Sequence, residues 1–467
     1  MKKQTQLPNT LTTPSFIQKL QWIADPVKYM ENAAQQYPDI FTARVVGFGD
    51  TIVFVNHPQG IQEIFANDRK KFATVGEINK IMQPFLGDYS LLMLDGDHHK
   101  SQRQLLMPPF HGERIRAYGE LINNLTKKVF SKLQKDLPFS ARNVMQEISL
   151  LVILQAIFGL YEGERCQKLQ HLLSLFLDAF RSPIISSIFF FSFLQKDLGA
   201  WSPWGNFLRQ REQINELLYA EIAERREHPE KDRIDILSLL MSARDETGKP
   251  ITDQQLRDEL ITLILAGYET TASAMAWGLY WIHHLPETRE KLLQELDSLG
   301  DSPDSMSIFR LPYLTAVCNE TLRICPVVMF SFPKIVQENV KILGYQLESG
   351  TAVVSSIYLT HHRKDLYPQP KQFKPERFLE RQFSPYEFLP FGGGVRRCLG
   401  EALALFEMKL VLATILSRYQ LALVDNQPER LQRRGFTLAP ARGVKMMITG
   451  QRTDRESLMT MATTSAL

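Results

Sequence analysis

The stretch FGGGVRRCLG, from Phe391 to Gly400, places one of the chain's four cysteines in a loop of glycines and arginines. A helical pattern follows the loop, so Cys398 stands where the helix dipole and free backbone N–H groups lower the pKa of a thiol. Arg396 and Arg397 add positive charge beside it. A thiolate in such a loop can be a nucleophile, a redox sensor or a metal ligand. The chemistry of this sulfur therefore decides how the rest of the chain is interpreted.

Composition excludes several classes of function. The cysteines form no C-x-x-C pair, so an internal zinc ribbon, an iron–sulfur site or a disulfide framework is not expected, and a reducing compartment is favoured. Lys and Arg number 54 against 51 Asp and Glu, and a net charge of +3 gives no reason to expect nucleic acid. Pro8 and its polar neighbours interrupt any apolar run near the start, which argues against a signal peptide or a membrane anchor. We expect a cytoplasmic monomer.

The organisation of the chain predicts one mainly α domain with a minor β region. Length alone suggests two or three domains, but no repeat and no Gly/Ser linker is present. A helical period runs from about Gly60 to Cys325. Strands are predicted in FTARVVGFGDTIVFVNHP around a turn at Gly47–Asp50, in Val340–Leu359, and around GFTLAP. The predicted boundaries are an N-terminal extension at residues 1–19, a domain at 20–450 and a disordered tail at 451–467.

The longest predicted helix is ITDQQLRDELITLILAGYETTASAMAWGLYWIHHLP. Thr252 and Gln255 form a capping box at its start, and Pro286 marks its end. Its middle contains AGYETT, Ala266 to Thr271, whose glycine and threonines weaken a helix. This segment is either a kink with a satisfied hydroxyl or a functional site inside the helix.

The spacing of residues in the cysteine loop gives that loop a more specific interpretation. Phe391, Gly394, Arg396, Cys398 and Gly400 spell F-x-x-G-x-R-x-C-x-G, which resembles the haem-binding loop of cytochromes P450. Further segments resemble P450 motifs in the family's order: DGDHHKSQR, AGYETT, the E-x-x-R of ETLR, and KPERF. The resemblance covers about residues 20 to 450, and the pattern is most similar to soluble bacterial, including cyanobacterial, P450s that oxidise fatty acids and terpenes.

The resemblance implies a P450 fold with a buried haem b. Cys398 would be the proximal thiolate to the haem iron, which favours O–O cleavage. Arg396, His99 and Arg103 would neutralise the haem propionates, and Phe391 would pack near the sulfur. Lys334 stands where many members have an arginine for a propionate. The full set of implied cofactor contacts is Cys398, Phe391, Gly392, Arg396, His99, Arg103, Lys334, Gly400 and Ala266.

The resemblance also separates catalytic from structural residues. Oxygen activation needs two protons, which Thr270 would deliver through a held water and Glu269 would bring from solvent. Glu320, Arg323 and Arg377 would form a carboxylate between two guanidiniums that locks the helix to the cysteine-loop side.

Electrons must come from another protein, because no G-x-G-x-x-G follows a strand. The expected donor is an acidic ferredoxin or flavodoxin with its reductase. Lys100, Arg103, Arg397 and Lys409 are the candidate docking cations, with a set of solvated charges as the alternative.

The substrate is expected to be apolar. Ser182–Leu194 is the most apolar stretch, too short to span a membrane, and is either a buried core helix or a channel roof that contacts a membrane surface. The expected pocket residues are Ile78, Met82, Phe85, Leu265, Ala266, Val328, Met329, Phe330 and Phe436. A long-chain fatty acid, an alkane-like molecule or a terpenoid, hydroxylated with O2, fits such a lining. The alternatives are a haem-thiolate gas or redox sensor, which needs no proton relay, and a thiolate-haem isomerase acting on a peroxide.

Overall fold

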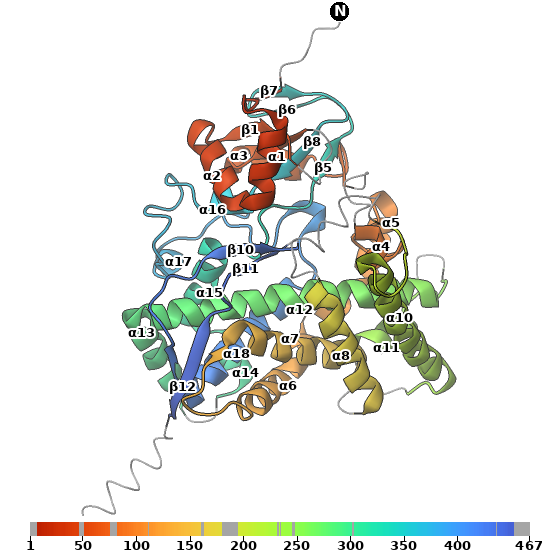
Figure 1. The fold of residues 1–467 in the computed structure, drawn as a ribbon, viewed down its shortest axis with the longest axis vertical. Coiled ribbons are helices and arrows are strands. Elements are labelled where there is room, and N and C mark those ends of the chain that lie inside the picture. Colours follow the sequence, from red (N-terminus) through yellow and green to blue (C-terminus); the bar gives the residue numbers. More distant parts are fainter. Residues whose placement is uncertain are drawn as a thin grey trace, which may run out of the picture.

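Helices form the larger part of the fold. The computed structural model describes residues 7–45, 51–74, 82–110, 112–159, 163–179, 195–230, 233, 235–244, 248–300, 303–435 and 437–452. The α-helices within these ranges are α1 (Ser15–Ala24), α2 (Pro26–Gln36), α3 (Pro58–Ala66), α4 (Gln83–Leu86), α5 (Gly96–Leu106), α6 (Glu113–Phe130), α7 (Ala141–Phe158), α8 (Glu164–Ala179), α10 (Pro203–Glu227), α11 (Ile236–Ser242), α12 (Asp253–His284), α13 (Pro286–Asp297), α14 (Ser305–Phe309), α15 (Pro312–Ile324), α16 (Ile357–His361), α17 (Arg377–Glu380) and α18 (Glu401–Arg418). Figure 1 shows α12 crossing the middle of the molecule.

The strands form four small sheets. The largest has the order β1-β2-β8-β5-β3, in which β2 and β8 are parallel and the other pairs antiparallel. The others are β4-β12-β9, β10-β11 and β6-β7. The strands are β1 (Ile40–Ala43), β2 (Ile52–Val55), β3 (Phe72–Ala73), β4 (Phe139–Ser140), β5 (Lys334–Val336), β6 (Val340–Ile342), β7 (Tyr345–Leu347), β8 (Ala352–Ser355), β9 (Tyr419–Leu423), β10 (Leu431–Arg434), β11 (Thr437–Pro440) and β12 (Lys445–Gln451).

The five-stranded sheet is buried on both faces. Successive side chains of a strand point to opposite sides, and Phe41 and Phe54 accordingly join one apolar cluster with Trp22 and Tyr29 of the first two helices. Ile40 and Val53 join another cluster that includes residues of α3. In Figure 1 this sheet and α1 to α3 lie on one side of α12, and α6, α7 and α18 lie on the other.

The central helix α12 begins and ends as its sequence predicts. Gln255 N–H donates to the Thr252 hydroxyl (3.2 Å), and Thr252 N–H donates to the Gln255 side-chain oxygen (2.9 Å), which completes the capping box. The helix ends at His284, before Pro286. The segment AGYETT is helical throughout. Gly267 lets α7 approach closely, because a Cβ there would overlap Ile153.

The helix α7 is apolar enough and long enough to cross a membrane, by length and composition only. Most of its residues are buried within the protein, against α12 and α6. A core helix of a large protein has the same composition, since it is surrounded by apolar side chains.

Two boundaries differ from the sequence prediction or lie beyond the structure. Residues 8–19, expected to lie in an extension, contact the sheet: the Thr42 hydroxyl donates to the Pro8 carbonyl (2.5 Å), and Leu11 N–H donates to the Thr42 carbonyl (3.1 Å). At the other end β12 reaches Gln451, and residues 453–467 of the predicted tail lie outside the described residues, as does the predicted turn at Gly47–Asp50.

Candidate functional site

The cysteine loop folds as a tight turn ahead of α18. A 3-10 helix covers Gly394–Arg396, and Cys398 N–H donates to the Phe391 carbonyl (2.9 Å). Gly392 has a φ of +69° with open space where a side chain would be, and a Cβ on Gly393 would overlap the ring of Phe65. These glycines therefore allow a backbone path that other residues would block.

Cys398 is the only exposed cysteine of the four, all of which lie in the described ranges. Protein nevertheless surrounds the sulfur closely enough that burial raises the pKa of the thiol. The Gly400 N–H and the charges of Arg103 and Arg397 lower this pKa, but by less. The predicted lowering of the Cys398 pKa is thus wrong for the protein alone, because desolvation outweighs the loop's positive field. Metal coordination deprotonates a thiol outright.

Arg396 lies inward from the loop, and its side chain is 4% exposed. Its guanidinium donates to the Leu91 carbonyl (2.9 Å), to the Leu94 carbonyl and to the Asp95 carboxylate (3.3 Å). Its Nε is buried without a hydrogen-bond partner among the described residues. One donor of Arg396 thus remains available for a further acceptor.

Three cations gather around His99, the buried histidine of α5. Burial, together with the charges of Arg396, Arg103 and Arg69, lowers the pKa of His99 to about 3, and Asp95 opposes the lowering. His99 is therefore neutral at physiological pH. These positive charges disfavour protonation of His99. A bound group that carries carboxylates would be attracted to the same cations.

Lys334 has a protein partner. Its buried ammonium donates to Asp68 (2.6 Å), and the other oxygen of Asp68 accepts from Val395 N–H of the cysteine loop (3.0 Å). This ion pair ties β5 to the cysteine loop, and the propionate contact expected of Lys334 stays a prediction.

The acid–alcohol segment is held differently at its two residues. Glu269 forms an ion pair with Arg142 of α7, and the Gln146 side chain donates to its second oxygen (2.5 Å). The Thr270 hydroxyl donates to the Ala266 carbonyl (2.6 Å). Ala266 is exposed and Thr270 half-buried, although buried residues flank them on α12. The helix therefore presents an accessible face at this point.

The predicted carboxylate between two guanidiniums is observed. Both oxygens of Glu320 accept from Arg323 (2.7 and 2.8 Å), and one also accepts from Arg377 (3.1 Å). Arg323 further donates to the His361 carbonyl (2.8 Å). Glu320 and Arg323 are fully buried. The three residues fix α15 to the segment that leads to the cysteine loop.

Comparison with known proteins decides the family. The family model for cytochrome P450 matches residues 8–446. The chain is 34% identical over 446 residues to cytochrome P450 135B1 of Mycobacterium tuberculosis, which covers 93% of this chain and 90% of that protein. The chain belongs to the cytochrome P450 family. It is also 32% identical over 454 residues to cytochrome P450 135A1 of the same species, with 96% of both chains covered.

Solved structures confirm the P450 fold. The retinoic acid-bound cyanobacterial CYP120A1 matches with a TM-score of 0.84 at 23% identity, over 95% of this chain and 99% of that chain. The haem domain of cytochrome P450DA matches with a TM-score of 0.82 at 22% identity, over 94% of this chain and 96% of that chain. At these identities the likeness concerns the fold alone.

This P450 is a monooxygenase whose cofactor is haem b. The residues present fit that group: an accessible thiol in an open glycine loop, an arginine whose buried Nε has no partner among the described residues, and a cluster of cations around His99 that the Asp95 carboxylate opposes only in part. With haem bound, the iron supplies dioxygen activation.

Not every predicted docking cation of the P450 lies on its surface. Lys100 is exposed, and Arg397 is exposed but paired with Glu401 (2.6 and 2.7 Å). Lys409 is 5% exposed and donates to the Phe309 carbonyl (2.8 Å) and the Thr315 hydroxyl (2.7 Å). The assignment of Lys409 to the docking face is wrong, because its ammonium is buried and hydrogen-bonded inside the fold.

Some of the side chains that were expected to line the substrate pocket pack against other apolar side chains. The ring of Phe85 packs edge-on against Phe207, with 4.9 Å between centroids, and Phe330 stacks on Trp22. Met329 is buried in the cluster around the same tryptophan. Met82, Leu265 and Val328 remain half-buried. Ile78, Phe436 and the segment Ser182–Leu194 lie outside the described residues.

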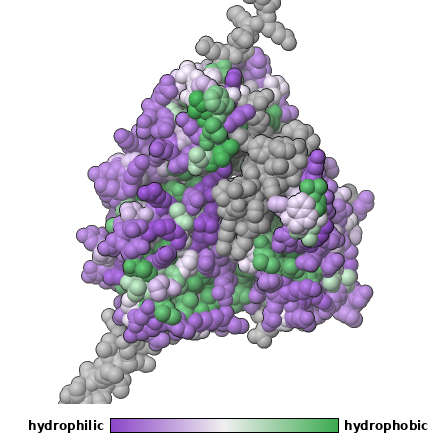
Figure 2. All heavy atoms as spheres, viewed as in Figure 1, coloured by the Kyte–Doolittle hydropathy of each residue, from purple (hydrophilic) through white to green (hydrophobic). Residues whose placement is uncertain are grey.

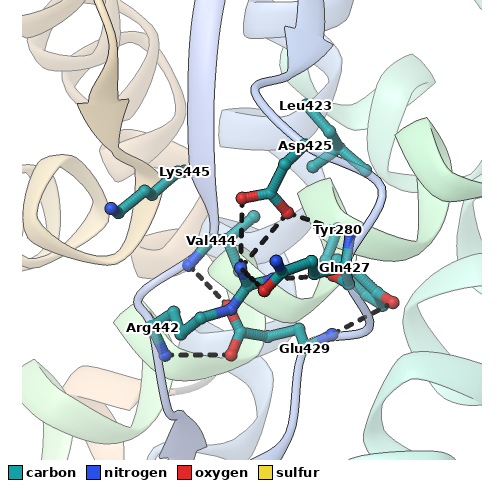
Figure 3. A pocket seen from close by; sticks show the side chains of 8 residues that line it. All are labelled: Tyr280, Leu423, Asp425, Gln427, Glu429, Arg442, Val444 and Lys445. Carbon is teal, nitrogen blue, oxygen red and sulfur yellow. Dashed lines mark hydrogen bonds and ion pairs between the residues drawn. The ribbon is translucent and has the colours of Figure 1, made fainter.

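A separate small pocket of the P450 is closed by its own residues (Figure 3). It lies between the β9 end and the start of β12. Arg442 donates to Asp425 (3.1 and 3.2 Å), and Glu429 accepts from Arg442 N–H (2.9 Å) and Val444 N–H (3.1 Å). These contacts hold two loops together and leave few groups for a ligand.

Sequence reasoning missed the partners of the site residues. Asp95 caps α5 and accepts from Thr74 N–H (2.7 Å) and Arg396. The position of Asp95 directly before a predicted helix is a sequence signal for an N-cap residue. Arg142 and Asp68 carried no local signal, since their partners lie 127 and 266 residues away.

Proposed function

We propose that this P450 hydroxylates an apolar molecule (a long-chain fatty acid, an alkane-like compound or a terpenoid) at an unactivated C–H bond, with Cys398 as the axial ligand of the haem iron. One oxygen atom of O2 enters the substrate and the other leaves as water, with two electrons and two protons taken up. The accessible Cys398 thiol in its open glycine loop carries this proposal.

The cofactor contacts follow from the cation cluster. With haem bound, Arg396, Arg103 and His99 would hold its propionate carboxylates, and the Nε of Arg396, unpartnered among the described residues, would donate to one of them. Phe391, whose carbonyl accepts from Cys398 N–H, and Gly392 would pack against the haem near the sulfur. Gly400 N–H acts on the sulfur itself and tunes its basicity.

Proton delivery is assigned to Thr270 and Glu269. The Thr270 hydroxyl donates its hydrogen to the Ala266 carbonyl, so the lone pairs of its oxygen are left to accept a hydrogen bond from a water. Glu269 directly precedes Thr270 in α12, and its side chain is 18% exposed. The acid is held by α7 while it connects the site with solvent.

The apolar substrate class is supported by the half-buried side chains of Met82, Leu265 and Val328. Titration with lauric to stearic acids and several sesquiterpenes tests it, because a bound apolar molecule displaces the haem-bound water and shifts the Soret band to shorter wavelength. A response to small polar aromatics alone would overturn the substrate class and leave the monooxygenase untouched.

The Cys398 assignment is tested by the reduced, CO-bound spectrum. Cys398→Ala should abolish the red-shifted band of thiolate-ligated haem, and Cys166→Ala, a matched cysteine buried elsewhere, should keep it. Retention of the band by Cys398→Ala would refute the ligand.

Electrons are supplied by a ferredoxin or flavodoxin with its reductase. Lys100 on α5 and the exposed Arg397 remain as docking cations, whereas Arg103 is half-buried and is assigned to a haem carboxylate. Reduction should slow as salt rises, since exposed attractions are screened within about 10 Å at ~0.1 M. Lys100→Glu should weaken this salt dependence. A reduction rate of the parent protein that does not change with salt would contradict docking on a basic face.

Location and surface contacts complete the proposal. We place the protein in the cytoplasm as a monomer, with a peripheral membrane contact near Ser182–Leu194. Leu198 and Trp201, which follow that segment, are 57% and 80% exposed. Figure 2 shows a largely hydrophilic described surface with scattered apolar areas. Flotation with vesicles, compared between the parent and Trp201→Ser, tests the contact.

A further inference from the structure

The loop at residues 87–95, between α4 and α5, is fastened to α12. Tyr89 N–H donates to the Asp258 carboxylate (3.0 Å). The hydroxyls of Ser90 and Thr262 lie 2.7 Å apart. Both contacts join this loop to the first half of α12, more than 160 residues away in sequence.

The chain at Gly87 is shaped for this contact. Gly87 has a φ of +82°, and a Cβ there would overlap the Asp258 carboxylate. Asp258 is itself fixed, because Arg257 donates to it (2.6 Å) and in turn donates to Asn215 (2.7 Å). The approach of the loop to Asp258 is therefore close and specific.

Glu259, the next residue of α12, is 1% exposed. Both of its carboxyl oxygens are buried without a hydrogen-bond partner among the described residues. The Leu91 N–H and the Gln102 amide face them and lower the pKa somewhat, but burial is the largest effect and raises the pKa of Glu259 to about 8. Both of these N–H donors favour the carboxylate, so burial, with the charge of Asp258 in support, keeps the proton on Glu259.

The opposite side of the same loop receives Arg396. The Leu91 carbonyl accepts from Arg396 (2.9 Å), as do the Leu94 carbonyl and the Asp95 carboxylate. Leu91 therefore faces Glu259 with its N–H and Arg396 with its carbonyl.

We propose that Asp258 and Glu259 form a clip through which α12 holds residues 87–95 in the conformation that seats Arg396, so that Glu259 is a positioning residue for the arginine of the cysteine loop. Glu259 acts through Leu91 and Gln102. The inference rests on the proposed contact of Arg396 with a haem carboxylate.

The clip is sensitive to pH. Asp258 on the same helix is the charged group that raises the pKa of Glu259, α5 presents the Gln102 amide, and the loop presents the Leu91 N–H. While the loop is seated, the pKa of Glu259 is about 8, so the side chain keeps its proton up to about pH 8. Once the loop is released and the site is hydrated, the pKa returns to its ordinary value of 4.5. The released population therefore rises by up to roughly tenfold per pH unit between these two values and levels off above the higher one.

Hydrogen exchange of the holoenzyme tests the clip directly. Exchange of residues 86–95, corrected for its intrinsic pH dependence, should rise between pH 6 and 8 and level off near pH 8. In Glu259→Gln, which stays neutral, exchange should be slow and independent of pH. Glu407→Gln is the matched control: burial raises the pKa of Glu407 on α18 to about 8 as well, but its partner is Ser149 of α7 and not the loop. A Glu259→Gln profile that follows the parent, or a Glu407→Gln profile that loses the pH dependence, would overturn the clip.

Transfer of haem to apomyoglobin tests the link to Arg396. The transfer rate should follow the same pH profile in the parent and in Glu407→Gln, and become flat in Glu259→Gln. Flat exchange combined with unaltered haem transfer in Glu259→Gln would overturn the positioning role. The CO-bound spectrum, measured in parallel, reports separately on Cys398, so failure of the ligand assignment is distinguishable.

Discussion

The guanidinium of Arg142 on α7 is ion-paired with the carboxylate of Glu269 on α12, and the Arg142 side chain is 3% exposed. A carboxylate that carries protons must change its partners, whereas Arg142 is fixed in the core. The pair thus joins Glu269 of α12 to α7. It also gives the acid a defined position beside Thr270.

We predict that Arg142→Gln lowers hydroxylation, because Glu269 loses the partner that orients it. General acid–base groups contribute roughly 10²–10⁴-fold to rates, so a loss of at least about tenfold in product formation is expected. Glu269→Gln should lose a similar factor, and the double variant no more than either single one. Additive losses in product formed per NADPH would show that the two residues act independently.

Replacement of Thr270 separates binding from proton delivery. Thr270→Ala should keep haem and substrate binding, since the hydroxyl bonds only to the Ala266 carbonyl of its own helix among the contacts described. Product per NADPH should fall and hydrogen peroxide should rise, because the water that the hydroxyl holds is lost. Thr270→Ser retains the hydroxyl and serves as the control. An unchanged product ratio in Thr270→Ala would remove the residue from the mechanism.

The buried Glu320 network should dominate stability over surface ion pairs. Arg323→Ala leaves the fully buried Glu320 carboxylate with too few donors, which costs about 3–5 kcal/mol. Lys132→Ala, which breaks the exposed pair with Glu147, should cost less than about 1 kcal/mol. Urea unfolding of the holoproteins measures both. Equal effects would contradict the assignment of the network to folding.

His99 should make acid conditions destabilising. Its pKa is about 3 in the folded protein against an ordinary 6.5, so the unfolded chain binds the extra proton between these values. Stability therefore falls as pH drops below 6.5, by up to about 1.4 kcal/mol per pH unit. In the haem-free protein, to which this pKa applies, His99→Gln should lose less stability than the parent between pH 6.5 and 5. Parallel pH profiles from urea unfolding would contradict a neutral His99.

Local sequence signals predicted the helix boundaries that depend on local chemistry. The helix α2 begins at Pro26, because Asp25 accepts from Lys28 N–H (3.0 Å) and Pro26 suits the first helical position. The capping box of α12 was predicted for the same reason. The resemblance to P450 motifs implied that Glu320, Arg323 and Arg377 lie together, and their hydrogen bonds agree with it.

Properties that depend on distant contacts were not predictable in this way. The direction of the Cys398 pKa was wrong because burial is set by the whole fold, whereas the dipole and nearby arginines are visible locally. Lys409 is spaced along α18 like a surface cation, yet it faces α14 and α15. Glu269 was recognised as an acid, but Arg142 is joined to it only by the packing of two helices.

The hydrogen bonds between residues 8–11 and β1 have a practical consequence for truncation. β1 is the outermost strand of its sheet, and Thr42 pairs its N–H with the Asn9 carbonyl (3.2 Å) and its carbonyl with Leu11 N–H (3.1 Å). Removal of residues 1–19, the extension expected from sequence, would leave these edge groups open to another chain, and unpaired edges promote aggregation. A shortened protein that keeps Pro8 onward retains this cover, and the same place sets the limit for an N-terminal fusion without a spacer.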